Sequence, residues 1–484
     1  MIRIFDYVNF SNMKNINADS GLHVQRNVIN YTLRRRDDFF FYLTCPKGKE
    51  EEVLKWIERP DRVKLVPLHY TTAGSLNKMY LDVVGLRKSF PWARYPLTVI
   101  WNNEAYMAPT ILQTFYATFP YSRISVANYV HWIEVPEQNK LGSIYVGNWH
   151  MWMLATSIAW TENTFFNSVY GIQMVLPYFR KFLRGDIYED ISAKMRPLYL
   201  GINVEELDKF KTNEKFEKPT FIFNQRLAQY TGASRVIRVA MRLIDDGYDF
   251  KLILTNPSQS TIKRAMEALF RKPKYRENII LNQGGLPFDK YVETLWRSDA
   301  VIAWHGGMGN KNDHPVNQWS IAFPEAIACG CYPIAHANGF FSEMLPREYL
   351  LPNREDETLY LAMRMLIESP EEYRKRASHV QSYVRENYDW NKRIDHWIKV
   401  FEDLHERSVQ KAGRLTPDTV KKILNLMETR GYFKWSDIRR ELSWASQIRL
   451  NRMSPYFWLC ENYTETPTAE PYFYKEKGKL GEFL

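Results

Sequence analysis

The stretch 317–345, NQWSIAFPEAIACGCYPIAHANGFFSEML, decides the fold. It reads as a short helix, a glycine stop, a strand and a second glycine turn. Pro324 would be penalised in a helix interior, but in a first turn it removes only an N–H that has no internal partner. The sequence therefore predicts a helix that begins near Ser320.

The start of that helix is a candidate anion site. Its first amides, at Ser320 and Ile321, and the helix dipole attract a negative group, typically phosphate. Glu325 is the single carboxylate of an otherwise small and apolar helix, and it would accept hydrogen bonds from sugar or ribose hydroxyls. The alternative is a buried crossover segment in which one Glu is satisfied by its neighbours.

Length and composition indicate a multidomain globular protein with a basic C-terminal piece. The chain has 484 residues, 45% hydrophobic and 25% charged, which is too long for one core. The net charge is +10, and residues 411–452 carry ten Lys or Arg against four Asp or Glu, 10 − 4 = +6. This excess favours an anionic partner for the C-terminal piece, with a solvated helix face as the alternative.

The sequence carries no sign of secretion or of a membrane span. Its first residues lack the basic-then-apolar pattern of a signal peptide, and no run approaches 18 uncharged apolar residues. The four cysteines show no ligand spacing beyond Cys329-x-Cys331, which reads as a packing pair. We therefore expect a soluble, cytoplasmic protein without integral membrane insertion.

Strand and helix patterns alternate in both halves of the chain. The opening IRIFDYVNF, the helix LHVQRNVINYTLRRR and the strand FFFYLTC form a βαβ beginning, and IAWTENTFFNSVYGIQ reads as strand, turn and helix. The charged segment DKFKTNEKFEKP ends in Pro and is predicted to be a linker. We predict an α/β fold with two Rossmann-like domains facing each other across a cleft. The expected parts are domains 1–207 and 220–388, linker 208–219, a crossover helix 389–407 and an accessory module 408–484.

The order of motifs over residues 1–407 resembles the GT-B nucleotide-sugar glycosyltransferases, in particular their large retaining group. The C-terminal domain of that family opens with a strand, a Gly-Arg pair and then Lys-Gly. Here FNQRLAQYTGA puts Arg226 and Gly232 in register, with Thr231 in place of the Lys. The family signature has two Glu separated by seven residues. Glu325 and the following AIACGCYP match its second Glu, while Asn317 stands at the first.

The resemblance implies a nucleoside-diphosphate sugar as co-substrate, a UDP-sugar first, with no cofactor and no metal. Arg226 would offer its permanently charged guanidinium group to the leaving diphosphate, and Glu325 would bind ribose hydroxyls. The implied donor-binding residues are Arg226, Thr231, Gly232, Gly285, Gly306, Gly307, Ser320 and Ile321.

Three residues are candidates for the transfer step: His131, Asn317 and Glu325. By resemblance His131, at the end of a strand, lies near the transferred sugar, although a strand-end His can also be structural. Asn317 can hydrogen-bond a sugar hydroxyl but cannot balance the charge of an oxocarbenium-like transition state. An inverting reaction would need a general base, for which Asp19, Glu104 and His131 are candidates.

Residues 408–484 read as three short helices followed by a β-hairpin. The helix TPDTVKKILNLMETRG has a Thr cap and Pro at its first position, and the hairpin is expected within SPYFWLCENYTETPTAEPYFYKE. This order resembles winged helix-turn-helix DNA-binding modules. The residues expected to contact nucleic acid are Lys434, Trp435, Arg439, Arg440, Arg449 and Arg452. The alternative is a basic cap docked on the enzyme, or a protein-contact module.

The predicted function is transfer of a sugar to a hydroxymethylated pyrimidine in double-stranded DNA, as bacteriophage glycosyltransferases do in the host cytoplasm. The base would be flipped from the duplex to reach the donor. One alternative is a cell-envelope polysaccharide or lipid-linked acceptor, with YFRKFLRGD (178–186) facing an anionic membrane. Another is a non-catalytic protein that binds sugar nucleotides or nucleic acid. The donor sugar, the stereochemical course and the oligomeric state stay open.

Overall fold

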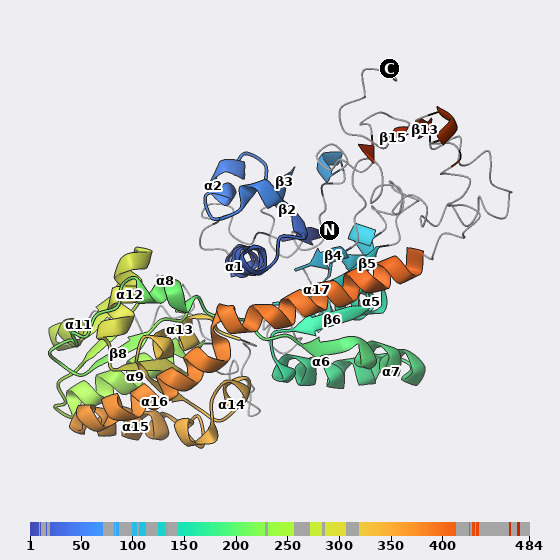
Figure 1. Cartoon of the computed structure of the whole chain (residues 1–484). Coiled ribbons are helices and arrows are strands. Elements are labelled where there is room, and N and C mark those ends of the chain that lie inside the picture. Colours follow the sequence, from blue (N-terminus) through green and yellow to red (C-terminus); the bar gives the residue numbers. More distant parts are fainter. Residues whose placement is uncertain are drawn as a thin grey trace.

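The computed structural model builds the chain from two parallel sheets and a small antiparallel one. The described residues are 1–8, 10, 16, 20–70, 82, 84–86, 99–103, 106–112, 124–131, 133, 144–227, 231–255, 272–282, 286–305, 319–412, 425, 428–430, 432–434, 464–465 and 472–474. Figure 1 shows the two large domains side by side.

The first sheet has seven parallel strands in the order β3-β2-β1-β4-β5-β6-β7. Its strands are β1 (Ile2–Tyr7), β2 (Phe39–Pro46), β3 (Val63–Leu68), β4 (Val99–Asn102), β5 (Ser125–Val130), β6 (Asn163–Phe166) and β7 (Met195–Pro197). Its helical segments are α1 (Ser20–Arg35), α2 (Glu50–Leu54), η2 (Pro60–Arg62), α5 (Ile144–Ala159), α6 (Val169–Phe182), α7 (Gly185–Lys194) and α8 (Val204–Asp208). The central strands β4 and β5 are buried at every position, as expected where helices cover both faces. The strand order reverses between β1 and β4.

The second sheet has five parallel strands in the order β10-β9-β8-β11-β12. These are β8 (Thr220–Phe223), β9 (Lys251–Leu254), β10 (Ile279–Leu281), β11 (Ala300–Ala303) and β12 (Tyr332–Ala335). Its helical segments are α9 (Ala233–Asp245), α11 (Pro273–Asn278), α12 (Phe288–Arg297), α13 (Ala322–Ala328), α14 (Phe341–Met344), η7 (Arg347–Tyr349), α15 (Asp356–Glu368) and α16 (Pro370–Tyr388). Here the strand order reverses between β8 and β11.

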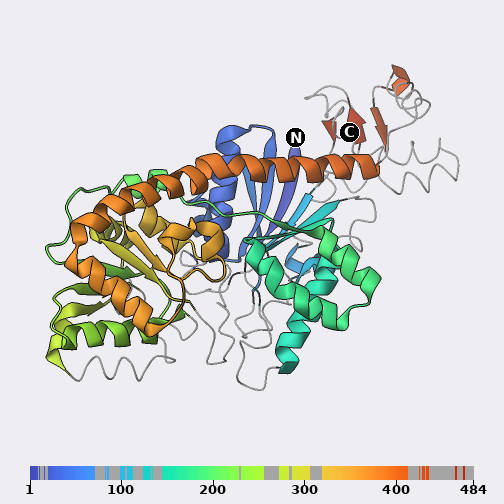
Figure 2. The same ribbon diagram turned by 90° about the horizontal axis from the view of Figure 1, so that it is seen from below.

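The helix α17 (Trp390–Ala412) joins the two domains. Figure 2 shows it running from the second domain along the first sheet. Trp397 and Phe401 are buried against the aromatic rings of Trp101 and Tyr129 on β4 and β5. One apolar core therefore runs from the first sheet through α17 to α13 of the second domain.

The prediction for the stretch 317–345 is confirmed where the structure describes it. The helix α13 begins at Ala322, so Pro324 lies in its first turn. Gly330 and Gly339 both have positive φ, at 89° and 71°, on either side of β12. The α/β fold with two parallel sheets is also confirmed, and so is the return of the last helix to the first domain.

Two sequence predictions are corrected. Ile158 and Ala159 end α5 instead of forming a strand, because the apolar side chains at Leu154 and Ile158 continue one helical face into the core. The strand follows at Asn163–Phe166. The crossover helix runs to Ala412, not 407, since neither Gly nor Pro interrupts the sequence between Trp390 and Ala412. The other domain boundaries stay predictions.

In the C-terminal piece the structure describes three strands. They are β13 (Tyr432–Lys434), β14 (Thr464–Glu465) and β15 (Tyr472–Tyr474). The antiparallel pairing of β14 with β15 confirms the predicted hairpin. β13 adds a third strand beside β15 and includes Lys434, so the short helix that the sequence predicts over KWSDIRRELSW (434–444) does not begin at Lys434. The predicted second and third helices lie outside the described residues, and the winged helix stays a prediction. Across the part of the chain that is described, every helix is too short or too polar to cross a membrane.

We predict that Trp397→Ala lowers the free energy of unfolding by about 3–5 kcal/mol, because it removes a fully buried indole from the α17 contact. Urea unfolding followed by fluorescence measures this loss. Lys399→Ala on the same helix is the control, since the Lys399 side chain is 75% exposed, and it should change stability by less than about 0.5 kcal/mol. Equal effects of the two substitutions would contradict the assigned contact.

Candidate functional site

The second sheet gathers polar residues where its strand order reverses. Ligands of open α/β sheets bind outside the carboxyl ends of the strands at such a point. Asn224 and Gln225 follow β8, and Ser320 lies two residues before α13. The Ser320 hydroxyl donates to Gln225 Oε1 at 2.8 Å, and Gln225 Nε2 donates to Asn224 Oδ1 at 3.1 Å. These bonds fix the end of β8 against the start of α13.

Gly232 allows the turn after β8 to lie against the end of β11. Its φ is 76°, and a Cβ there would lie 2.1 Å from the carbonyl oxygen of Trp304. Thr231 is buried beside it and donates its hydroxyl to the backbone oxygen of Arg226 at 2.7 Å. The Thr231 side chain therefore stabilises the turn, whereas the Arg226 side chain is exposed beside it.

Glu325 is a partly buried carboxylate on α13 whose described hydrogen-bond donor is a tyrosine. Tyr291 of α12 donates its hydroxyl to Glu325 Oε2 at 3.3 Å, and Asn224 Nδ2 donates to the Tyr291 oxygen at 3.1 Å. Within the described residues, no Lys or Arg forms an ion pair with Glu325. Burial raises the pKa of Glu325 to about 7, only partly offset by the Tyr291 hydrogen bond. Most of its acceptor capacity is thus left for a ligand.

Arg26 brings a positive charge from the first domain toward Glu325. It lies on α1, and its guanidinium is 4.5 Å from the centre of the Trp56 ring. Its ion pair with Glu206 of α8 is long, at 3.5 Å. Burial lowers the pKa of Arg26, and the charges of Glu206 and Glu325 act against that shift. The sequence analysis missed Arg26, because nothing in its spacing distinguishes it from Arg34 on the same helix.

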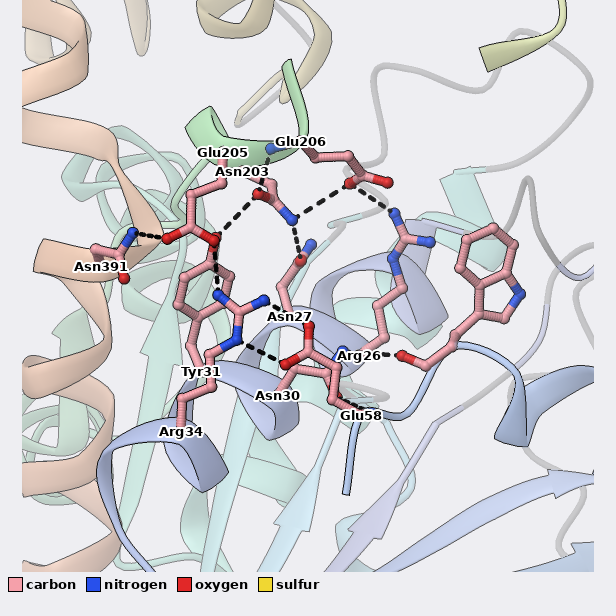
Figure 3. Close-up of polar contacts among 11 residues, drawn as sticks. Arg26, Asn27, Asn30, Tyr31, Arg34, Glu58, Asn203, Glu205, Glu206 and Asn391 are labelled. Atoms are coloured by element: carbon pink, nitrogen blue, oxygen red, sulfur yellow. Dashed lines mark hydrogen bonds and ion pairs between the residues drawn. The ribbon is translucent and has the colours of Figure 1, made fainter. Parts of the chain in front are cut away.

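A polar network fixes α1 relative to α8 and α17 (Figure 3). The Tyr31 hydroxyl donates to Asn203 Oδ1 at 2.9 Å, and Asn203 Oδ1 also caps the start of α8 by accepting from the Glu206 amide at 3.0 Å. Glu205 accepts from Arg34 at 2.8 Å and from Asn391 of α17 at 2.8 Å. Contacts with α8 and α17 therefore fix the position of α1, the helix that carries Arg26.

His131 ends β5 close to the start of α1. Its backbone oxygen accepts from Asn167 Nδ2 at 3.1 Å. The charge of His131 acts on His23 of α1, whose pKa is lowered to about 3 by burial, then by Arg26 and by His131. His23 is thus neutral at physiological pH. The structure therefore brings His131 near His23 and Arg26, and His23 was another residue that sequence reasoning missed.

The first sheet also carries a polar cluster where its order reverses, between β1 and β4. Asn103 donates to Asp6 Oδ1 at 2.7 Å and to the Tyr7 backbone oxygen at 3.1 Å, and its own oxygen accepts from Trp101 at 3.1 Å. Burial raises the pKa of Asp6 well above its ordinary value. This cluster lies at the carboxyl end of the first sheet, where its strand order reverses.

Several predicted site residues lie outside the described residues. These are Asp19, Glu104, Gly285, Gly306, Gly307, Asn317, Trp435, Arg439, Arg440, Arg449 and Arg452. Their roles stay predictions. Over the described ranges, no three His, Cys, Asp or Glu side chains gather in a way that could hold a metal ion.

Solved structures share this architecture. Sucrose-phosphate synthase from Thermosynechococcus elongatus superposes with a TM-score of 0.62 at 13% identity, over 84% of this chain and 100% of that one. Anabaena HepE in complex with UDP superposes with a TM-score of 0.58 at 13% identity, over 83% of this chain and all of that one. The fold is that of the GT-B glycosyltransferases.

Two curated proteins match by sequence, and no family model matches. The chain is 27% identical over 238 residues to tRNA-queuosine alpha-mannosyltransferase of Drosophila melanogaster, covering 47% of this chain and 57% of that protein. It is 22% identical over 215 residues to an uncharacterized glycosyltransferase of Methanocaldococcus jannaschii, covering 43% and 52%. The matches thus span about half the length of these relatives.

We predict that Glu325→Gln stabilises the protein in a pH-dependent way. The folded-state pKa of about 7 lies above the ordinary value of 4.5, so ionisation of Glu325 lowers the free energy of unfolding as the pH rises from 4.5 to 7. At pH 8 the variant should exceed wild type by up to about 3 kcal/mol, and below pH 4.5 this advantage should vanish. Urea unfolding at both pH values tests this. Exposed Glu372→Gln is the control, and a pH-independent difference would contradict the shift.

We also predict that Gly232→Ala destabilises more than Gly247→Ala. Both glycines have positive φ, 76° and 91°, so both substitutions bear the left-handed backbone strain. Only at Gly232 does the new Cβ meet backbone, and overpacking of this kind adds about 1–3 kcal/mol. Thermal unfolding of the two variants isolates this close approach, and equal losses would exclude it.

Proposed function

We propose that the protein is a glycosyltransferase that uses a nucleoside-diphosphate sugar, a UDP-sugar first. The observation that carries this proposal is Glu325. It is a partly buried carboxylate with one described hydrogen-bond donor, at the point of the GT-B fold where the second sheet reverses its strand order. Ionised Glu325 accepts hydrogen bonds from the two ribose hydroxyls, and Tyr291 holds the carboxylate in orientation.

The leaving diphosphate needs positive potential as the glycosidic bond breaks. Arg226, exposed after β8, supplies it from the second domain, and Arg26 supplies it from α1 of the first domain. The amides at Ser320 and Ile321 stay predicted phosphate contacts. His131 and Asn317 stay predicted to lie beside the transferred sugar, with the neutral Asn317 as a hydrogen-bonding group.

The acceptor that we propose is a hydroxyl on a modified base in nucleic acid, and first a hydroxymethylated pyrimidine in duplex DNA. The net charge of +6 over residues 411–452 supports an anionic polymer as the partner. The strand order β13-β15-β14, with the two predicted helices between β13 and β14 in sequence, supports a winged-helix arrangement.

Transfer RNA is a second candidate acceptor, favoured by one specific finding. The Drosophila melanogaster relative is named as a mannosyltransferase of tRNA-queuosine, a hydroxyl-bearing modified nucleoside in RNA. Both candidates share the chemistry of a base-borne hydroxyl attacking the anomeric carbon of the donor sugar. They differ in the polymer that the C-terminal piece would hold.

The decisive experiment incubates the full chain with UDP-glucose, GDP-mannose and other sugar nucleotides. The acceptors are duplex DNA with 5-hydroxymethylcytosine, unmodified duplex and queuosine-containing tRNA. Mass spectrometry of the digested nucleosides then shows which base gains a hexose. Transfer to the hydroxymethylated duplex alone supports the DNA proposal, and transfer to tRNA alone replaces it with the second candidate. If no acceptor gains sugar and no donor is hydrolysed, the transferase proposal fails.

We predict that Glu325→Gln lowers transfer by about 10–100-fold through a higher KM for the donor, because each hydrogen bond to a charged group contributes about 1.5–3 kcal/mol. Retention of DNA on a filter should not change. In wild type the same KM should rise as the pH falls below 7, when Glu325 takes up its proton. Truncation after Ala412 should have the opposite effect to Glu325→Gln. It should lower the retention of DNA and leave the binding of UDP intact.

A further inference from the structure

Glu343 of the second domain contacts the start of a helix in the first. It lies on α14, after the carboxyl end of β12, and α6 follows the carboxyl end of β6. Glu343 Oε2 accepts from the Val169 amide at 2.7 Å, and Oε1 accepts from the Tyr170 amide. The Tyr199 hydroxyl also donates to Glu343 Oε2, at 3.1 Å. One carboxylate therefore bridges the two domains through three hydrogen bonds.

This contact completes the capping of α6. The first amides of a helix have no partner within the helix, and a negative charge there interacts favourably with the helix dipole. Ser168, the N-cap, accepts from the Gly171 amide at 3.0 Å. The Val169 and Tyr170 amides are capped by Glu343 instead, so α6 is fully capped only while the second domain lies against it.

The segment that precedes α6 leads directly to His131. Asn167 and Ser168 are both fully buried, and Asn167 Nδ2 holds the backbone oxygen of His131. Only Ser168 thus separates the donor to His131, Asn167, from the first amide bound by Glu343, that of Val169. A change in the distance between the domains would therefore reach His131 through a short, buried piece of chain.

Aromatic side chains pack beside the bridge, whose own residues are partly buried. Tyr199 packs on Trp319 with ring centres 5.5 Å apart, and Trp319 packs on Tyr388 at 5.3 Å. The Tyr388 hydroxyl donates to the backbone oxygen of Met344 at 3.1 Å, next to Glu343. Burial, then the nearby charge of Glu343, raises the pKa of Tyr199 to about 12, so this hydroxyl stays a donor over the physiological range.

We propose that Glu343 is a positioning residue that latches the two domains together and sets His131 in place for sugar transfer. Its effect on transfer rests on the proposed function, whereas its effect on domain closure does not. Charge-assisted hydrogen bonds are stronger than neutral ones, and here two from backbone amides and one from the Tyr199 hydroxyl all end on one side chain. The polar part of the latch therefore depends on a single carboxylate.

The test uses Glu343→Gln and Val169→Pro in the full chain. Gln keeps the size of Glu but loses the charge and presents an NH2 to one of the two amides. Pro fits the first position of a helix, and Ser168 before it already has the extended backbone, φ −159° and ψ 154°, that a residue before Pro adopts. Val169→Pro therefore deletes one latch donor while keeping α6. Glu348→Gln, an exposed Glu on the same domain, is the control.

Small-angle X-ray scattering of the free protein measures its radius of gyration, which increases if the two domains move apart. We expect both variants to increase the radius of gyration, the double variant to add nothing further, and Glu348→Gln to match wild type. In the transfer assay the variants should lose at least tenfold in kcat, while the dissociation constant for UDP alone changes less than twofold. A purely structural cap would instead lower the unfolding midpoint with scattering unchanged, and this outcome would overturn the latch.

The two proposals fail in different ways. If wild type transfers no sugar but the variants expand in scattering, the latch stands and the transferase assignment falls. If wild type transfers sugar and the variants keep both its scattering profile and its kcat, Glu343 is not a positioning residue. If scattering is unchanged and kcat falls, the latch is also overturned, because domain closure is then not what Glu343 controls.

Discussion

The packing of α17 on the first sheet is the contact on which the rest of the structure depends. Two βα domains joined by a polar segment have no intrinsic reason to keep one orientation, since interfaces between domains are usually small. Here the chain leaves the second domain at Tyr388 and immediately buries Trp390, Trp397 and Phe401 in the first. The backbone adds a bridge, because Ile202 donates to Tyr388 and Trp390 donates to Ile202, at 2.7 and 3.0 Å. A close approach of Gly201 to the Trp390 ring leaves no room for a side chain there. The segment at Gly201 and Ile202, before the linker, and the start of α17, after the second domain, thus pack against each other.

That orientation explains the chemistry between the domains. Glu325 comes from α13 and Arg26 from α1, and each side chain is largely withdrawn from solvent although Arg26 has a long ion pair, at 3.5 Å, and Glu325 has none within the described residues. Withdrawing charges from water in this way destabilises a fold, and it raises the pKa of Glu325. A chain selected for stability alone would replace both residues. Their presence is explained if a ligand with hydroxyls and phosphates completes the hydrogen bonds that the protein leaves unmade.

Polar contacts around α17 fall into two groups with different consequences. Glu205 and Asn203 tie α1, α8 and α17 together through several partly exposed bonds, which fix direction more than they add stability. Beside the start of α17, where the Tyr388 hydroxyl contacts Met344, Glu343 accepts hydrogen bonds from the first amides of α6. The first group spreads over several side chains, while the bridge to α6 that the described residues form through Glu343 ends on one carboxylate.

The sequence by itself determined the secondary-structure elements and the short helix that contains Pro324. Only the tertiary structure decided which side chains from distant parts of the chain contact one another. Local rules fixed α13, because Pro324 is tolerated only in a first turn and Gly330 ends the helix with a positive φ. The same rules located most strands and the hairpin of the C-terminal piece. They misplaced the strand before α6, since Ile158 suits a helix or a strand equally and packing in the core made the choice. Arg26, Tyr291 and Glu343 carry no local signal: each is an ordinary charged or aromatic residue on a helix. Their roles come from contacts with residues far away in sequence, Glu206, Glu325 and Val169. The folding of each domain makes the first two contacts, and the packing of the two domains makes the third.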